Sequence, residues 1–195
     1  MTGIIILAAG NSSRLGQPKQ LLQYKDATLL QHIMKEASVI KESFVIVVTG
    51  ANHELIEKKI DSSKIKIAFN RDWELGMSSS IKTGLNKAFQ LYPEIEKCIL
   101  AVCDQPFVSH SIFENLITEF HKTGKGIVAS SYAETFGTPV LFDKKYFGEL
   151  LNLKGQEGAK KIINRFLEDT ASVSFEKGNI DIDTEDDYNK LISEL

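Results

Sequence analysis

Apolar runs of strand length alternate along this chain with segments in which apolar residues recur at helical spacing. The expected strands cover residues 3–9, 44–49, 65–69, 97–102, 126–131, 138–142 and 171–175. The expected helices cover 28–39, 52–61, 77–90, 109–124 and 157–168, and a last helix opens at Thr184. Thr28 and Ser109 are the expected starts of two of these helices, since hydroxyl side chains favour that position.

Most of these strands are continuous apolar runs, which indicates burial on both faces. Strands that alternate with helices predict a mostly parallel sheet with right-handed crossovers and helices on both sides. No Pro/Ser-rich linker and no internal repeat interrupts the pattern, so we expect a single α/β domain over residues 1–195. Ligands of such sheets bind beyond the carboxyl ends of the strands. The segments that follow the strands at 3–9 and 97–102 are therefore the first places to look for chemistry.

Composition and charge exclude some classes of protein. The 195 residues are 43% hydrophobic and 25% charged, as in an ordinary globular protein, and the net charge of −3 argues against a general nucleic-acid binder. Cys98 and Cys103 lie in an apolar stretch and are expected to be buried thiols of a reducing compartment. The first apolar run lacks a basic flank and is too short to cross a bilayer. We expect a cytoplasmic protein that acts away from membranes and nucleic acids.

The segment after the first strand reads Leu-Ala-Ala-Gly-Asn-Ser-Ser-Arg-Leu-Gly-Gln-Pro-Lys over residues 7–19. A turn of glycines and small polar residues after a buried strand can aim several backbone N–H groups at one anion. Arg14 and Lys19 add two cations that suit a triphosphate; the alternative is a polar turn with solvated cations. Neither the P-loop nor the Rossmann glycine pattern is present. The candidate nucleotide-binding residues here are Leu7, Ala8, Ala9, Gly10, Asn11, Ser12, Ser13 and Gly16.

Carboxylates follow two of the expected elements. Asp104 comes directly after the apolar strand at 97–102, a position that suits Mg²⁺, although a turn-forming aspartate is the simpler alternative. Near the end of the chain, Asp181 and Asp183 alternate with Ile182, which places both carboxylates on one face of an extended segment. Asp183 could also cap the last helix.

Ser78 and Ser80 fall at the expected N-terminus of the helix at 77–90, shortly after Trp73. Hydroxyls and free N–H groups at a helix start can bind a base edge or a phosphate, and simple capping is the alternative. A single tryptophan is more often a packing residue than a ligand-stacking one.

These blocks resemble the MobA-like NTP transferase family, and most of all its molybdenum-cofactor cytidylyltransferase branch. Residues 7–19 are similar to the family loop L-A-A-G-x-S-x-R-M-G-x-x-K, residues 70–81 to N-x-x-W-x-x-G-M-x-x-S-[IL], and residues 104–106 to D-Q-P. The tail from Asp181 resembles D-[IV]-D-T-x-[ED]-D. The resemblance implies a three-layer, Rossmann-like α/β/α fold of the GT-A-like nucleotide-diphospho-sugar transferase type.

The resemblance also assigns roles. Arg14, Lys19 and Asp104 would be catalytic, Ser78 and Ser80 would recognise cytosine, and Asp181, or Asp183 in its place, would complete the metal site with Asp104. Ala9 stands where guanylyl-transferring relatives carry glycine, which implies CTP as the substrate. The implied reaction moves CMP from CTP onto the phosphate of molybdopterin, with Mg²⁺ as cofactor and pyrophosphate as the second product. The implied protein is a monomer whose partner is a molybdenum hydroxylase or its chaperone.

The acceptor side departs from the family pattern. Thr138 stands where many relatives have histidine, and Gln156 and Lys160 replace an aspartate and an arginine. Lysine lacks the bidentate fork that arginine offers to a phosphate. A sugar-phosphate or polyol-phosphate nucleotidyltransferase and a non-catalytic nucleotide- or cofactor-binding protein therefore stay open as alternatives.

Overall fold

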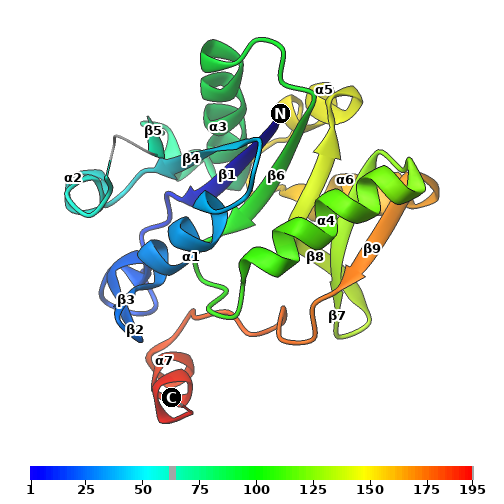
Figure 1. The fold of residues 1–195 in the computed structure, drawn as a ribbon. Coiled ribbons are helices and arrows are strands. Elements are labelled where there is room, and N and C mark those ends of the chain that lie inside the picture. Colours follow the sequence, from blue (N-terminus) through cyan, green and yellow to red (C-terminus); the bar gives the residue numbers. More distant parts are fainter. Residues whose placement is uncertain (62–64, 195) are drawn as a thin grey trace.

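The computed structural model describes residues 1–61 and 65–194. Its main feature is a seven-stranded sheet with the order β5-β4-β1-β6-β8-β7-β9 (Figure 1). The strands are β1 (Thr2–Ala8), β4 (Ser43–Thr49), β5 (Ile65–Phe69), β6 (Lys97–Val102), β7 (Ile127–Tyr132), β8 (Thr135–Asp143) and β9 (Thr170–Ser174). Within this sheet β8 runs antiparallel to both of its neighbours, and the other pairs are parallel. The prediction of a mostly parallel sheet is confirmed.

Helices cover both faces of the sheet. They are α1 (Leu29–Ser38), α2 (His53–Glu57), α3 (Met77–Leu91), α4 (His110–Thr123), α5 (Phe147–Leu151), α6 (Ala159–Arg165) and α7 (Glu185–Ser193). Short 3₁₀ turns occupy Lys19–Leu21, Trp73–Leu75, Lys144–Tyr146 and Leu167–Asp169.

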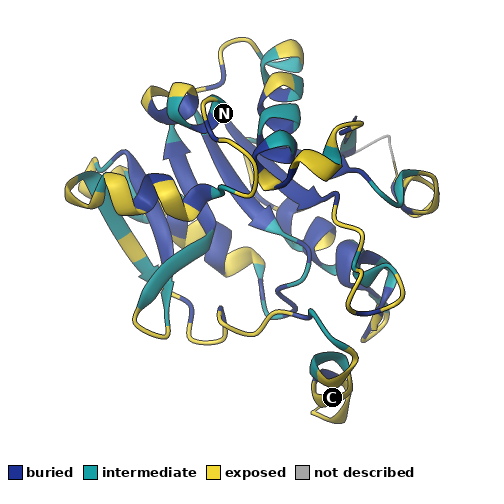
Figure 2. Ribbon diagram, turned by 180° about the vertical axis from the view of Figure 1, so that it is seen from behind, coloured by how far each residue is buried: buried dark blue, intermediate teal, exposed yellow. Residues whose placement is uncertain are grey.

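Alternate residues of the strands face two separate apolar cores. On one face Ile5 and Ile46 pack with residues of α3, α5 and α6; on the other, Ile4 and Val47 pack with α1, α2 and α4. Figure 2 shows the strands as buried ribbons between helices whose outer surfaces are exposed. The expected three-layer α/β/α arrangement is confirmed.

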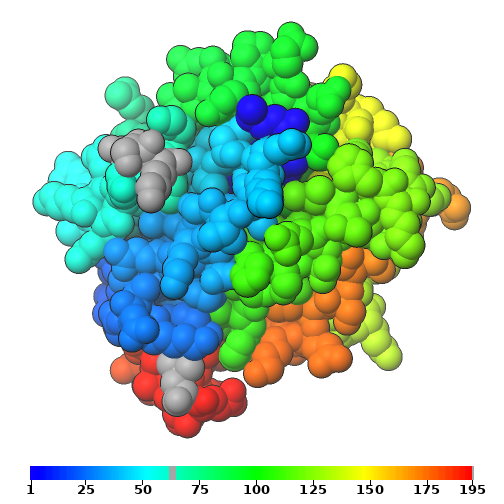
Figure 3. All heavy atoms as spheres, viewed as in Figure 1, coloured from blue at the N-terminus to red at the C-terminus, as the bar shows by residue number. Residues whose placement is uncertain are grey.

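A third, smaller core joins the two ends of the chain. Leu15, Leu22, Tyr24, Ile182 and Leu191 are buried together, where a short hairpin of β2 (Gln23–Tyr24) and β3 (Ala27–Thr28) meets α7. Figure 3 shows the C-terminal segment in red at the bottom of the molecule, against blue residues that follow β1. This core holds the loop after β1 close to the C-terminal carboxylates.

Several helix boundaries follow from local chemistry. Thr28 and Thr184 each accept a hydrogen bond from the backbone N–H three residues on, and each forms a reciprocal capping box. Gly124 ends α4 in the left-handed conformation that glycine adopts without a steric penalty. Two predicted helices are shorter than expected: 52–61 is helical only over His53–Glu57, and 157–168 only over Ala159–Arg165. Within the described residues, no helix is long and apolar enough to cross a membrane.

Candidate active site

The carboxyl ends of β1 and β6 meet at one edge of the sheet. The two strands are parallel neighbours with Leu7 opposite Val102, so the loop after β1 and the turn that begins at Cys103 emerge side by side. This juxtaposition follows from the parallel pairing and places the site where open α/β sheets bind ligands.

The loop after β1 is shaped by its own side chains. Ser12 has a positive φ of 54° and its hydroxyl accepts a hydrogen bond from the backbone N–H of Lys19 at 3.0 Å. Gly16, with a φ of 69°, completes the turn in the left-handed region. Gln20 is almost fully buried, and its amide donates to the carbonyls of Ala8 and Gly10 at 3.0 and 2.9 Å. These bonds fix the backbone where β1 ends and the loop begins, while the N–H groups of Ser13, Leu15 and Lys19 donate within the loop itself.

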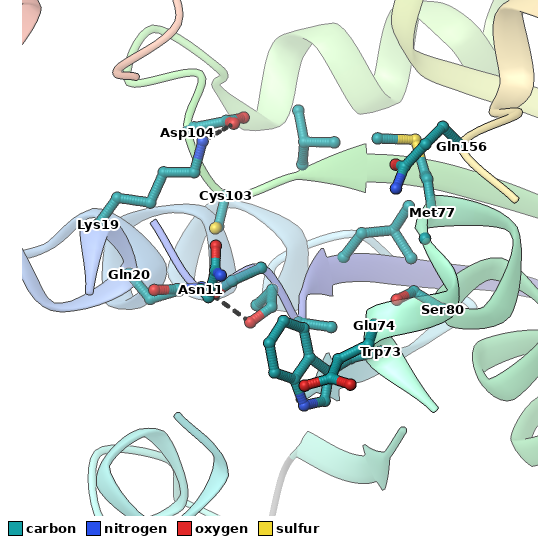
Figure 4. Close-up of a pocket in the computed structure, with 16 residues that line it drawn as sticks. Asn11, Lys19, Gln20, Trp73, Glu74, Met77, Ser80, Cys103, Asp104 and Gln156 are labelled. Atoms are coloured by element: carbon teal, nitrogen blue, oxygen red, sulfur yellow. Dashed lines mark hydrogen bonds and ion pairs between the residues drawn. The ribbon is translucent and has the colours of Figure 1, made fainter. Parts of the chain in front are cut away.

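A cavity of about 540 Å³ opens above this loop (Figure 4). Predicted nucleotide-binding residues that line it are Leu7, Ala8, Ala9, Gly10, Asn11 and Ser80, together with Lys19 and Asp104. Trp73 and Gln156, which the sequence analysis considered in other roles, also line it, as do Gln20, Glu74, Gly76, Met77, Val102 and Cys103. A Cβ added to Gly10 would meet no atom within 4 Å, so a ligand can approach this backbone closely.

Lys19 joins the loop to two carboxylates. Its Nζ lies 2.6 Å from Asp104 Oδ2 and 2.7 Å from Asp183 Oδ1, and only 15% of its side chain is exposed. Arg14, which is largely exposed, pairs with the other oxygen of Asp183 at 2.7 Å. The backbone N–H of Ile182 donates to the Asp104 carbonyl at 2.9 Å, which fixes the C-terminal segment against the end of β6.

The electrostatics of this cluster follow from burial and pairing. Burial alone would lower the pKa of Lys19, but attraction and a hydrogen bond to Asp104, with a second bond to Asp183, raise it above its usual range. The hydrogen bond from Lys19 lowers the pKa of Asp183. Burial, and then the neighbouring charges of Asp104 and Asp183, raise the pKa of Asp181. Asp104 and Asp183 therefore share one ammonium, Asp183 also pairs with Arg14, and Asp181 lies near enough to both carboxylates to feel their charge.

The donor set suits a hard divalent cation. Asp104 lines the cavity and Asp183 approaches it at Lys19, whereas Asp181 lines a separate hollow with Phe107 and Asp187. Carboxylate oxygens are the ligands that Mg²⁺ and Mn²⁺ prefer. Across residues 1–61 and 65–194, no three His, Cys, Asp or Glu side chains converge as a metal cluster, and Lys19 lies between Asp104 and Asp183. Asp183, rather than Asp181, shares the ammonium with Asp104.

The two serines after Gly76 lie on different sides of α3. Ser80 lines the cavity, and its hydroxyl accepts a hydrogen bond from the buried amide of Asn70 at 3.0 Å. Ser78 lines a separate polar hollow with Lys82 and Lys154. Ser12, Ser13, Arg14 and Gly16 also lie outside the cavity lining, where Ser12 and Gly16 shape the loop.

Cys103 lines the cavity but is only 4% exposed. Burial raises the pKa of its thiol to about 12, with the adjacent Asp104 acting in the same direction. The thiol therefore stays protonated at neutral pH and is a poor nucleophile.

Thr138, Gln156 and Lys160, which the sequence places on the acceptor side, lie in different parts of the structure. The Thr138 hydroxyl donates to Gln105 Oε1 at 3.2 Å, and Gln105 Nε2 donates to the Gly178 carbonyl at 2.7 Å. This chain of bonds ties β8 to the segment that carries the C-terminal carboxylates. Gln156 lies instead in the cavity lining, and Lys160 is exposed on the first turn of α6.

Comparison with known sequences places the chain in a family. The sequence pattern of the MobA-like NTP transferase domain matches residues 4–171, which is most of the chain and includes the loop after β1 and Asp104. The chain belongs to the MobA-like NTP transferase family. The expected family assignment is confirmed, and with it membership of a nucleotidyltransferase family.

Two curated relatives of this MobA-like NTP transferase show the range of the family. It is 27% identical to the molybdenum cofactor cytidylyltransferase of Escherichia coli K12, covering 94% of this chain and 92% of that protein. It is 28% identical to the nicotine blue oxidoreductase of Paenarthrobacter nicotinovorans, covering 98% of this chain and 96% of the relative.

Solved structures confirm the fold of this MobA-like NTP transferase. The homologue of Mycobacterium tuberculosis Rv0371c from Mycobacterium sp. strain JC1 is 31% identical, with a TM-score of 0.86 over 99% of this chain and 96% of that one. Rv0371c from M. tuberculosis H37Rv, solved in complex with manganese, is 25% identical, with a TM-score of 0.81 over 100% and 99% of the two chains.

Proposed function

We propose that this protein transfers CMP from CTP onto the phosphate of molybdopterin or its molybdenum form, with Mg²⁺ as cofactor and release of pyrophosphate. The observation that carries the proposal is the contact of Lys19 with Asp104 and Asp183 at the mouth of the anion-binding loop. Similarity to a molybdenum cofactor cytidylyltransferase supports the acceptor, and Ala9 in the loop supports CTP.

The residues divide the work of phosphoryl-type transfer, which needs positioning and charge neutralisation more than covalent help. Backbone N–H groups at Gly10 and Asn11, with the Lys19 ammonium, bind the β- and γ-phosphates. Asp104, Asp181 and Asp183 would hold Mg²⁺, which when bound neutralises charge at the α-phosphate and the acceptor. Arg14, at the outer edge, offsets the charge of the departing pyrophosphate.

The bond changes need no strong general base. An oxygen of the acceptor phosphate attacks the α-phosphorus in line, a new P–O bond forms, and the bond between the α-phosphorus and the bridging oxygen to the β-phosphorus breaks. Pyrophosphate leaves with that oxygen. A phosphate monoester is already largely ionised near neutral pH, so its oxygen is a competent nucleophile. We therefore assign no side chain to proton removal.

On this proposal residues 1–195 form one nucleotidyltransferase domain, a monomer in the cytoplasm that delivers its product to a molybdenum hydroxylase or its chaperone. The alternative, transfer to a sugar phosphate or polyol phosphate, shares the same nucleotide side. A non-catalytic binder is disfavoured because binding alone does not require three carboxylates beside the phosphate loop.

The test is pyrophosphate release from each of the four NTPs with Mg²⁺ and, in turn, molybdopterin, its molybdenum form, a sugar 1-phosphate and a polyol phosphate. Release from CTP with molybdopterin, at least tenfold above the other NTPs, supports the proposal. Release only with a sugar or polyol phosphate would show that this phosphate, and not molybdopterin, is the acceptor. No release with any pair, from protein that binds CTP, would support a binding protein instead.

A further inference from the structure

The loop that carries Gln156 is fastened to the start of α3. The carbonyl of Gly155 accepts a hydrogen bond from the backbone N–H of Ser78 at 3.1 Å. A Cβ on Gly76, whose φ is 99°, would lie 2.5 Å from the Gly155 oxygen and 2.9 Å from the side-chain amide carbon of Gln156. Only glycine allows so close an approach of these two segments. The position of Gln156 is therefore set by backbone contacts to the wall that contains Met77 and Ser80.

Gln156 faces the nucleotide cavity from the side away from the carboxylates. It lines the cavity together with Gly76, Met77 and Ser80 (Figure 4), whereas Lys19 and Asp104 form the opposite side. Within the described residues its side-chain amide has no hydrogen-bond partner. Gln156 is exposed, so its amide is open to solvent and to a ligand that enters the cavity.

The two sides of the cavity suit different parts of one nucleotide. The proposed function places the phosphates at Lys19, so the base of the same NTP extends toward Ser80 and Met77. The acceptor must reach the α-phosphorus from the side of Asp104, where Gln105 binds Thr138. Gln156 lies with the first group of residues and not with the second.

We propose that Gln156 binds the nucleobase of the NTP and not the phosphorylated acceptor, an inference that rests on the proposed function. A neutral amide offers one carbonyl acceptor and an N–H donor, which match the amino group and ring nitrogen at the pairing edge of cytosine. The replacement of the family's aspartate by Gln156 is then a change on the nucleotide side of the site.

The experiment compares a ligand that has a base with one that lacks it. Dissociation constants of CTP and of inorganic tripolyphosphate, each with Mg²⁺, are measured by calorimetry for wild type, Gln156→Met and the matched control Gln90→Met. Methionine preserves the length and volume of the side chain and removes the amide. Gln90 lies on α3, outside the cavity lining. Thermal unfolding of each variant checks that the fold is retained.

We expect Gln156→Met to weaken CTP binding about tenfold, because one to two hydrogen bonds are lost. Tripolyphosphate binding and the KM of the acceptor should stay unchanged. Gln90→Met should change none of these. Equal losses for CTP and tripolyphosphate, no loss for either, or a raised acceptor KM with unchanged CTP binding would each overturn the inference. Wild type that binds neither CTP nor tripolyphosphate would instead refute the proposed function, and the inference with it.

Discussion

Lys19 and Asp104 are 85 positions apart in the sequence, and Lys19 Nζ lies 2.6 Å from Asp104 Oδ2. The contact joins the loop after β1 to the carboxylate after β6, and Asp183 approaches the same ammonium from the C-terminal segment. The ammonium lies between the two carboxylates that the proposed function assigns to a divalent cation. On that proposal, Lys19 binds the carboxylates in the free protein and the phosphates when the nucleotide is bound.

Replacing Lys19 by methionine should change metal and nucleotide binding in opposite directions. Without the ammonium, the carboxylates of Asp104 and Asp183 lose their counter-charge and should bind Mn²⁺ about tenfold more tightly in the absence of nucleotide. CTP should bind at least about tenfold more weakly, since a charged partner of its phosphates is lost. Mn²⁺ binding is followed by electron paramagnetic resonance and CTP binding by calorimetry.

Lys25→Met is the matched control for this prediction, because Lys25 is exposed in the β2–β3 hairpin. It should leave both affinities unchanged. Unchanged Mn²⁺ affinity in Lys19→Met would show that the ammonium does not compete with the cation.

Gly50 should prove necessary for the shape of the cavity. A Cβ at this position would lie 2.6 Å from the Ala9 oxygen and 2.7 Å from the Cβ of Trp73, two walls of the nucleotide cavity. Gly50→Ala must push these walls apart, so we expect a loss of about 1–3 kcal/mol of stability and several-fold weaker CTP binding. Gly148→Ala, where an added Cβ meets no atom within 4 Å, is the control and should leave CTP binding unchanged. Normal stability and CTP affinity in Gly50→Ala would contradict the described packing.

Asp169 should make the stability of the fold depend on pH. Burial alone would raise the pKa of Asp169, but hydrogen bonds from Lys145 at 2.7 Å, Tyr146 at 2.6 Å and the Gly126 N–H at 3.2 Å lower it. A lowered folded-state pKa contributes stability that is present above the unfolded value of about 4 and is lost as the pH falls through the folded value. Asp169→Asn should therefore lower the free energy of unfolding by about 1–2 kcal/mol at pH 7.

The difference in the free energy of unfolding between wild type and Asp169→Asn should shrink below about pH 4, because Asp169 is then protonated and, like asparagine, neutral. Urea unfolding at pH 7 and at low pH measures it, with Asp26→Asn in the exposed hairpin turn as the control. A difference that is equal at both pH values would show that the charge of Asp169 is not what stabilises the contact.

The sequence predicted the strands of the sheet well. The strands at 65–69 and 97–102 have the predicted bounds, because continuous apolar runs end sharply at polar residues. Ala133 and Glu134, by contrast, form the β7–β8 turn with positive φ angles of 45° and 58°. Neither is a residue that usually signals such a turn, so the full length of β8 was not apparent.

The candidate site was predicted less completely, for geometrical reasons. Ser78 and Ser80 are two positions apart on a helix that turns by about 100° per residue, so they cannot face the same cavity. The alternation around Ile182 predicted Asp181 and Asp183 on one face, but Asp183 contacts Lys19 and Arg14 whereas Asp181 lines a separate hollow. Gln20 carries no local signal, since its position depends on contacts with distant backbone. Gln156 was expected on the acceptor side, and its place in the cavity lining was not predicted.

Pyrophosphate release from CTP with Mg²⁺ and molybdopterin by Asp104→Ala tests the central role of the carboxylate at the end of β6. Asp26→Ala, an exposed aspartate in the hairpin turn, serves as the matched control. The account predicts that Asp104→Ala loses at least about a thousandfold in rate while its unfolding temperature stays near that of wild type, and that Asp26→Ala is unaffected. Asp104→Ala protein that still releases pyrophosphate at the wild-type rate would contradict it.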